Sequence, residues 1–148
     1  MPQIRISKQF KFEMAHVLMG YDGPCKNVHG HSYELIVTVK GEPVDDYASP
    51  KLGMVMDFGD LKTIVRQQII DVFDHALVLN KRMPEEVTNH LQQHFEKVIL
   101  LDYQPTSEMM VADFAGRISS KLSEKQKLVH VLLRETATSY AEWFEIDN

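Results

Sequence analysis

Residues 25–39 read CKNVHGHSYELIVTV, in which two histidines one residue apart run into an alternating, β-branched segment. Positions i and i+2 of a β-strand point to the same face, so the pattern predicts a strand on which His29 and His31 aim both imidazoles at one point. A third histidine, His16, ends an earlier alternating segment. If the two strands pair as antiparallel neighbours, His16 lies beside the other two. Three neutral imidazoles with no fixed fourth ligand form a catalytic type of zinc site with an open position.

The histidine pattern has two other interpretations. A His-x-His pair on a strand can simply be two polar residues on an exposed face. Cys25, four residues before His29, could also join the three histidines and close a structural zinc site, because zinc accepts mixed sulfur and nitrogen ligands. The residues alone leave the open, closed and metal-free interpretations standing.

Composition is that of an ordinary globular chain. The 148 residues are 44% hydrophobic and 25% charged, which fits one domain over residues 1–148. The net charge of −5 gives no sign of a nucleic-acid partner. A single cysteine excludes an intrachain disulfide and fits a reducing compartment. No signal-peptide core and no apolar run of roughly 18 residues is present, so we expect a cytoplasmic protein without a membrane partner.

Alternating apolar residues predict four strands. Two lie at residues 3–18 and 31–41, with a loop over residues 19–30 between them. Two more are expected at residues 128–134 and 139–146, around a short turn.

Two helices are predicted from apolar residues at spacings of three and four. Asp57 is the expected N-cap of the first, which ends near Phe73. The second starts after Pro105, with Thr106 or Ser107 as its cap. The resulting order, β-β-α-α-β-β, predicts an α+β fold with an antiparallel sheet and helices packed on one face.

Two segments are less regular. Residues 42–52 are polar and are predicted as a connection, after which Val55-Met56 finishes the hairpin. In residues 81–101, Pro84 suits the first turn of a helix with an apolar stripe, and Val98–Leu101 is expected to be extended.

Six motifs, in order along most of the chain, resemble those of the 6-pyruvoyltetrahydropterin synthase/6-carboxytetrahydropterin synthase family. They are Phe12-Glu13-Met14-Ala15-His16, Cys25-x3-His29-Gly30-His31, Asp57-Phe58, Asp74-His75, Pro105-Thr106-Ser107-Glu108 and Arg134-Glu135-Thr136. The three residues between Cys25 and His29 resemble the carboxytetrahydropterin branch, which serves queuosine (7-deazaguanine) synthesis. The pyruvoyl branch usually has a longer spacer there.

The resemblance implies a substrate, a fold and an assembly. The substrate is 7,8-dihydroneopterin triphosphate, a small molecule. The fold is the tunnelling fold, in which the sheets of several subunits join into an oligomeric barrel. Hexamers built from two trimers are usual, and the active sites lie between subunits.

The resemblance also implies roles for residues. His16, His29 and His31 match the zinc ligands, and Cys25 matches the thiol that transfers protons. Asp74 and His75 match a relay pair that the neighbouring subunit normally supplies. Glu135 matches the carboxylate that anchors the pterin.

Chemistry gives independent reasons for some of these roles. A carboxylate such as Glu135 on an otherwise apolar strand needs a partner, although a strand-end salt bridge would also serve. An adjacent Asp74-His75 pair at a helix end is often only capping. Glu108 suits the dipole at a helix N-terminus and is a candidate for substrate binding. His90 and His94 stand at i and i+4, a spacing that can bind metal, but a solvated helix face is the simpler interpretation.

Two features depart from the family pattern. The segment between Asn80 and Pro105 is longer than in compact relatives, and Met109 replaces a common asparagine. The leading hypothesis is a zinc-dependent 6-carboxytetrahydropterin synthase. The alternatives are a 6-pyruvoyltetrahydropterin synthase and a non-catalytic zinc- or pterin-binding protein on the same scaffold.

Overall fold

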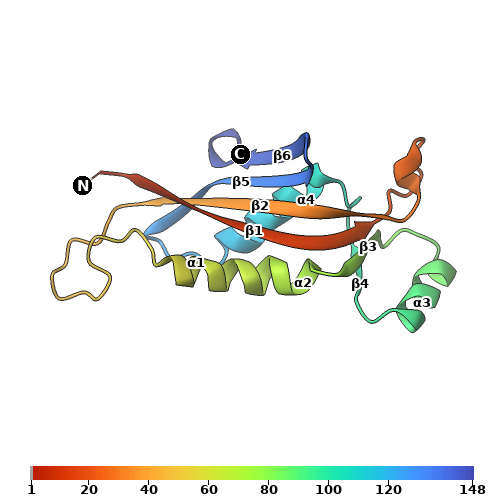
Figure 1. Ribbon diagram of the computed structural model, residues 1–148, viewed down its shortest axis with the longest axis horizontal. Helices are drawn as coiled ribbons and strands as arrows, with labels where there is room; N and C mark the ends of the chain where they lie inside the picture. Colours follow the sequence, from red (N-terminus) through yellow and green to blue (C-terminus); the bar gives the residue numbers. More distant parts are fainter. Residues whose placement is uncertain (1) are drawn as a thin grey trace.

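A six-stranded sheet in the order β4-β3-β1-β2-β5-β6 organises the chain in the computed structural model, which describes residues 2–148 (Figure 1). The strands are β1 (Ile4–His16), β2 (His29–Gly41), β3 (Ala76–Asn80), β4 (Val98–Leu101), β5 (Gln126–Thr136) and β6 (Ser139–Phe144). The helices are α1 (Phe58–Val65), α2 (Asp71–Phe73), α3 (Glu85–His94) and α4 (Ser107–Ser119). A π-helical turn, Arg66–Ile70, joins α1 to α2, and short 3-10 turns occupy Pro24–Lys26 and Glu145–Asp147.

The two long strands at the centre form the predicted antiparallel hairpin. β1 pairs with β2 over its whole length, and His16 stands directly opposite His29. Alternate side chains such as Phe12 and Tyr33 are buried on one face, and their rings stack at 5.2 Å between centroids. His16, His29 and His31 therefore lie at one end of the sheet face that packs against the core.

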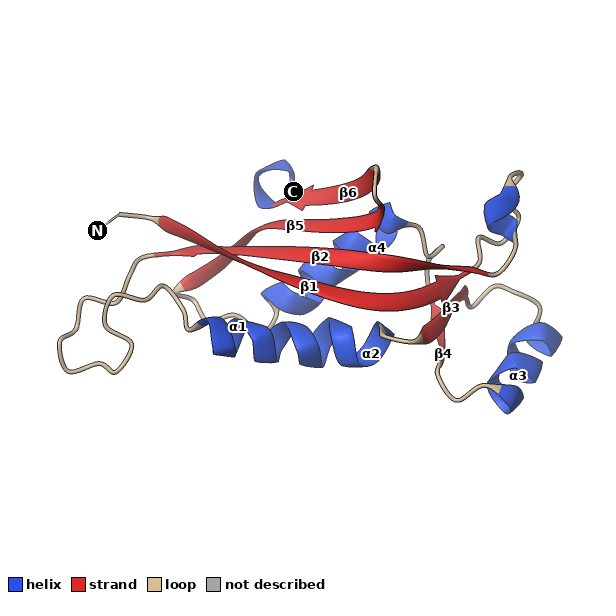
Figure 2. Ribbon diagram, viewed as in Figure 1, coloured by secondary structure: helices blue, strands red, loops and turns tan. Residues whose placement is uncertain are grey.

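Helices cover that same face, as Figure 2 shows. Asp57 caps α1 by accepting a hydrogen bond from the backbone N–H of Gly59, and Thr106 caps α4 by accepting one from Met109. Both caps are as predicted, and the first helical rod ends at Phe73. One core cluster combines the sheet residues with the inner sides of these helices, including Phe73 and Phe114.

The four predicted strands pair antiparallel as expected, but the whole sheet is mixed, which corrects the prediction of an antiparallel sheet. β3 pairs in parallel with β1 and with β4, whereas the other pairs are antiparallel. β3 was not predicted from the sequence. Its residues Ala76–Asn80 are almost all buried, so they lack the alternation that marks a half-exposed strand.

Smaller differences concern the ends of elements. Val55 and Met56 lie in a loop, not in a strand, and β2 begins at His29, inside the predicted loop. β6 ends at Phe144 because the next residues form a 3-10 turn.

The helix predicted near Pro84 exists as α3, but its apolar stripe is not a core face. Val87 and Phe95 remain 40% and 57% exposed, and α3 lies at one end of the molecule, beyond β3 and β4 in Figure 2. Within residues 2–148, no helix is both long and apolar enough to span a membrane.

Candidate functional site

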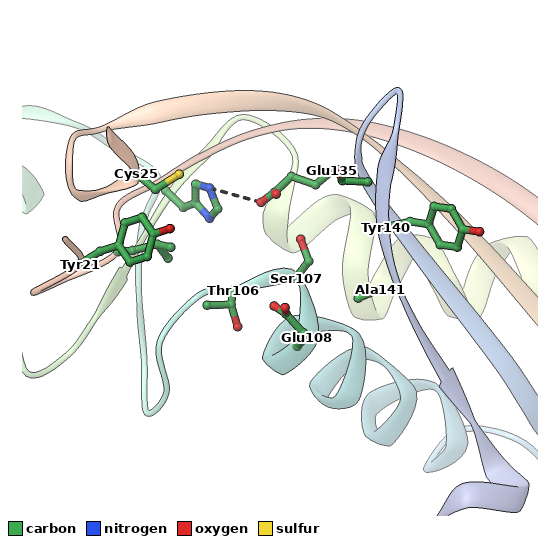
Figure 3. A pocket seen from close by; sticks show the side chains of 11 residues that line it. Tyr21, Cys25, Thr106, Ser107, Glu108, Glu135, Tyr140 and Ala141 are labelled. Carbon is green, nitrogen blue, oxygen red and sulfur yellow. Dashed lines mark ion pairs between the residues drawn. The ribbon is translucent and has the colours of Figure 1, made fainter. Parts of the chain in front are cut away.

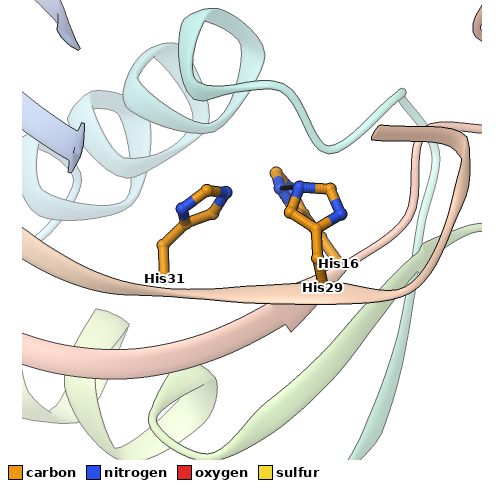
Figure 4. Close-up of side chains that lie close together, drawn as sticks. All are labelled: His16, His29 and His31. Atoms are coloured by element: carbon orange, nitrogen blue, oxygen red, sulfur yellow. Dashed lines mark hydrogen bonds between the residues drawn. The ribbon is translucent and has the colours of Figure 1, made fainter. Parts of the chain in front are cut away.

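The structure brings His16, His29 and His31 together at one end of the central hairpin (Figure 4). One potential ligand atom from each lies within 4.8 Å of the other two. The Nε2 atoms of His16 and His29 are 3.1 Å apart. Two nitrogen ligands on a tetrahedral zinc ion, each at its usual bond length, are about 3.3 Å apart. The spacing of the pair therefore matches that of two ligands on one ion.

Hydrogen bonds to backbone carbonyls set which nitrogens are free. His16 Nδ1 lies 2.7 Å from the Pro105 carbonyl oxygen, and His29 Nδ1 lies 2.8 Å from that of Asn27. A neutral ring that donates its Nδ1–H in this way presents a lone pair at Nε2. Two lone pairs then face each other across 3.1 Å, an arrangement that a cation between them stabilises.

The third histidine, His31, has a ring nitrogen whose hydrogen-bonding capacity is unsatisfied. His31 Nε2 is buried and has no hydrogen-bond partner among the described residues. A buried polar atom without a partner costs free energy, and a metal ion would satisfy it. Burial also lowers the pKa of His16, which favours the neutral form that a metal requires. The spacing of the cluster, the neutral form of His16 and the Nε2 lone pairs of His16 and His29 fit a metal ion such as zinc.

A cavity of about 330 Å³ opens beside the histidines (Figure 3). Glu135 lies on one side of it, and Cys25 and Tyr21 lie on the other. Ser107 and Glu108, at the start of α4, line a third side. The cavity thus joins a carboxylate, a thiol and hydroxyl groups next to the three imidazoles.

Glu135 is close to the histidines without being one of their cluster. Its Oε1 atom lies 3.6 Å from His16 Nε2 and 3.7 Å from His31 Nε2. It also accepts a 3.4 Å hydrogen bond from the hydroxyl of Tyr33. The carboxylate therefore has a second acceptor oxygen available to a ligand in the cavity.

Cys25 stands outside the group of atoms that could share one ion, although it lines the same cavity. Its backbone carbonyl accepts a hydrogen bond from the N–H of Leu18 at 3.0 Å, which ties the loop to the end of β1. The arrangement corresponds to the open interpretation of the metal site more closely than to the closed one.

The Asp74-His75 pair does not reach this cavity in its own chain. His75 Nδ1 lies 3.0 Å from Asp74 Oδ1, and the His75 side chain is 77% exposed. Its backbone has a φ of 61°, a left-handed conformation that is uncommon for a residue other than glycine. The backbone N–H of Glu13 donates to Asp74, and this hydrogen bond is the main reason why the pKa of Asp74 is lowered. The pair is a fixed unit that projects from the molecule.

The other histidines weighed in the sequence lie elsewhere. The rings of His90 and His94 are 4.5 Å apart on α3, with no third ligand gathered beside them among residues 2–148. His130 lies 3.0 Å from Glu142 on the face of the sheet away from the helices.

Three contributors to the site had no site role predicted from the sequence. Tyr33 is 1% exposed, and its ring centroid lies 5.6 Å from that of His31. Its position two residues after His31 on the same strand could have indicated that both side chains share one face. Ser107 has a buried hydroxyl with no hydrogen-bond partner within residues 2–148. The Pro105 carbonyl had no sequence signal, because its contact with His16 spans 89 residues.

Comparison with known proteins gives a consistent result. The model of the 6-pyruvoyl tetrahydropterin synthase family matches residues 5–145. A 6-carboxy-5,6,7,8-tetrahydropterin synthase from Haemophilus influenzae is 37% identical over 143 residues, which cover 95% of this chain and 99% of that protein. The enzyme of the same name from Rickettsia bellii is 31% identical over 94% of this chain and 99% of its own.

Solved structures share the fold. A protein from Wolinella succinogenes superposes with a TM-score of 0.79 at 19% identity, covering 98% of this chain and 99% of the other. The Caenorhabditis elegans 6-pyruvoyl tetrahydropterin synthase gives a TM-score of 0.68 at 24% identity, covering 97% and 96%.

Proposed function

The chain belongs to the 6-pyruvoyl tetrahydropterin synthase family, and we propose that it acts as a zinc-dependent 6-carboxytetrahydropterin synthase. The proposed substrate is 7,8-dihydroneopterin triphosphate. With one water consumed, the products are 6-carboxy-5,6,7,8-tetrahydropterin, triphosphate and acetaldehyde. The cytoplasm and the queuosine pathway are the proposed setting, and the single cysteine fits such a reducing compartment.

One observation carries the proposal: a thiol and a carboxylate line a cavity together with His16, whose free nitrogen converges with nitrogens of His29 and His31. A protein that only binds zinc or a pterin has no need of a thiol beside an open metal position. The relatives named above bear the name of the proposed activity and match the chain along almost its whole length.

We assign the metal to His16, His29 and His31. Three neutral ligands leave the full charge of a zinc ion available to polarise an oxygen of the substrate side chain. The carbonyl oxygens of Pro105 and Asn27 hold the rings of His16 and His29 in the tautomer that such an ion needs.

We assign proton transfer at carbon to Cys25, because its thiol faces the same cavity and a thiolate is an effective base. Removal of a proton from the side chain allows triphosphate to leave by elimination. Water adds to the first side-chain carbon, and cleavage of its bond to the second carbon releases the two-carbon fragment as acetaldehyde and leaves a carboxylate on the ring.

We assign recognition of the pterin to Glu135. A pterin presents a 2-amino group and an N3–H on one edge, and a carboxylate offers two acceptors at matching separation. The bond from Tyr33 and the packing of the strand fix the orientation of Glu135. Ser107 and Glu108 line the facing wall and are further candidates for substrate contacts.

The relay pair requires a second copy of the chain. The side chain of His75 is among the most exposed of the proposed site residues, and it does not line the cavity that contains Cys25 and Glu135. We propose that Asp74 and His75 complete the cavity of a neighbouring subunit, in a homohexamer of two trimers. Orientation by Asp74 suits His75 for proton shuttling near neutral pH.

Product analysis tests the proposal. Zinc-loaded protein is incubated with 7,8-dihydroneopterin triphosphate, and the pterins are identified by mass spectrometry. The expected product is 6-carboxytetrahydropterin, and Cys25→Ala should form none while retaining zinc. A pterin that keeps all three side-chain carbons would identify a 6-pyruvoyl-forming enzyme, and an unchanged substrate would favour a binding protein.

A further inference from the structure

The face of the sheet away from the helices carries a row of like charges. Arg5 on β1 stands directly opposite Lys40 on β2, and Lys40 stands directly opposite Lys127 on β5. Residues paired in this way project from the same face, and like charges placed directly opposite each other are destabilising. Lys40 lies on β2, which is paired on both sides at this position, so the central cation does not serve to block an exposed sheet edge.

Elsewhere on the same face, a carboxylate lies between two cations. Glu34 on β2 stands between Lys11 on β1 and Arg134 on β5, and the Arg134 Nε atom lies 3.9 Å from Glu34 Oε1. A carboxylate thus separates the two cations in that row. The row of Arg5, Lys40 and Lys127 lacks the corresponding carboxylate.

An irregularity in β5 creates the row. Thr38 pairs with His130, but the next residue of β2 pairs with Leu128, so Val129 is an extra residue that bulges from the ladder. Because side chains alternate along a strand, Lys127 and His130 would otherwise point to opposite faces. Bulges re-aim side chains in this way and are often found next to functional sites.

A pocket of about 620 Å³ contains the row. Two hydroxyls lie next to the cations, and the Ser7 and Thr38 oxygens are 2.8 Å apart. Glu145 is the carboxylate that lines this pocket, and it lies 2.6 Å from Lys127 Nζ. Within residues 2–148, no carboxylate lies within salt-bridge distance of Arg5 or Lys40. The pocket therefore holds two cations without counter-charges beside hydrogen-bond donors.

We propose that this pocket binds a small polyphosphate anion. The three cations span two strand spacings, roughly 9.6 Å, so a linear ion with several charges can reach all of them. Charge-assisted hydrogen bonds to phosphate oxygens are the strong contacts that Arg and Lys make. A nucleic acid is disfavoured by the net charge of −5. The pocket lies at the opposite end of β1 from His16 and on the opposite face of the sheet.

The test uses inorganic triphosphate as the probe and zinc-loaded protein at low salt. Lys40→Gln removes the central cation, and Lys11→Gln is the matched control on the same face. We expect Lys40→Gln to weaken triphosphate binding by about tenfold or more in calorimetric titration, because a charged hydrogen bond is lost. Lys11→Gln should bind as the parent does. Any triphosphate held at the histidine cavity is common to all three proteins and does not change with Lys40.

A second readout comes from melting without the anion. The Tm of Lys40→Gln should equal or exceed that of the parent, because a repulsion is removed, while triphosphate should raise the Tm of the parent more than that of the variant. Equal affinities for triphosphate would overturn the proposal. A lower Tm of anion-free Lys40→Gln would also overturn it, because it would reveal an internal partner of Lys40. Binding of single-stranded RNA that depends on Lys40, without binding of triphosphate, would overturn it as well.

Discussion

Replacing Glu135 by glutamine separates pterin recognition from metal binding. The substitution keeps the shape of the side chain but removes its charge and turns one acceptor into a donor. In the proposed complex that donor faces another donor on the pterin edge, so one of two hydrogen bonds is lost and the other loses its charge. The Glu135 side chain is only 27% exposed, so water replaces these contacts incompletely.

The expected loss follows from these contacts. Hydrogen bonds to charged groups, together with an unpaired donor in a partly dry pocket, should cost about 2–4 kcal/mol of pterin binding. That range corresponds to an affinity about 30- to 1000-fold weaker. Zinc content should stay at about one ion per subunit, since the three histidines hold the metal in this account.

The assay is titration of 6-carboxytetrahydropterin into parent and variant proteins, each loaded with zinc. Glu142→Gln is the matched control, because Glu142 is also a strand carboxylate near a histidine but lies on the other face of the sheet. Equal affinities of Glu135→Gln and the parent would exclude Glu135 from pterin recognition and shift the assignment to Glu108. Loss of zinc from Glu135→Gln would instead make Glu135 a ligand.

The remaining predictions concern the metal, the relay pair and the assembly. His31→Ala should lose most of its zinc, whereas His90→Ala should keep it. Cys25→Ala should keep zinc and lose turnover. Loss of metal from Cys25→Ala would favour the closed structural site. The hydrogen bond from the backbone N–H of Glu13 lowers the pKa of Asp74. The Asp74 carboxylate therefore stabilises the fold fully above its unfolded pKa of about 3.8, and this stabilisation is lost as pH falls through the folded pKa. The Tm difference between the parent and Asp74→Ala should therefore shrink in acid, and a constant difference would exclude this linkage. Co-assembly of Cys25→Ala with His75→Ala subunits should restore about a quarter of the parent activity if each site combines two chains, whereas inactive mixtures would contradict a shared site.

The histidine cluster was predictable because it depends on local periodicity. The strand period of two places His29 and His31 on one face, and pairing of two consecutive strands adds His16. Helix caps at Asp57 and Thr106 were predictable for a similar reason, since the cap and the hydrogen bond it accepts lie within a few residues.

Features that depend on distant segments were not predictable. The apolar run Ala76–Asn80 is buried by neighbours on both sides, which removes the alternation that would mark it as β3. The burial of Ser107 and the bulge at Val129 depend on how α4 and β2 pack against other elements. The Asp74-His75 motif was recognisable in the sequence, but only the structure shows that it does not line the cavity of its own chain.

The fate of the side-chain carbons distinguishes the proposed carboxy-forming reaction from the pyruvoyl-forming alternative. The zinc-loaded protein is given 7,8-dihydroneopterin triphosphate labelled with carbon-13 at the two terminal side-chain carbons, and the products are followed by NMR. The account predicts that all of the label leaves as acetaldehyde and that the pterin product is an unlabelled carboxylate. Label retained in the pterin would contradict it.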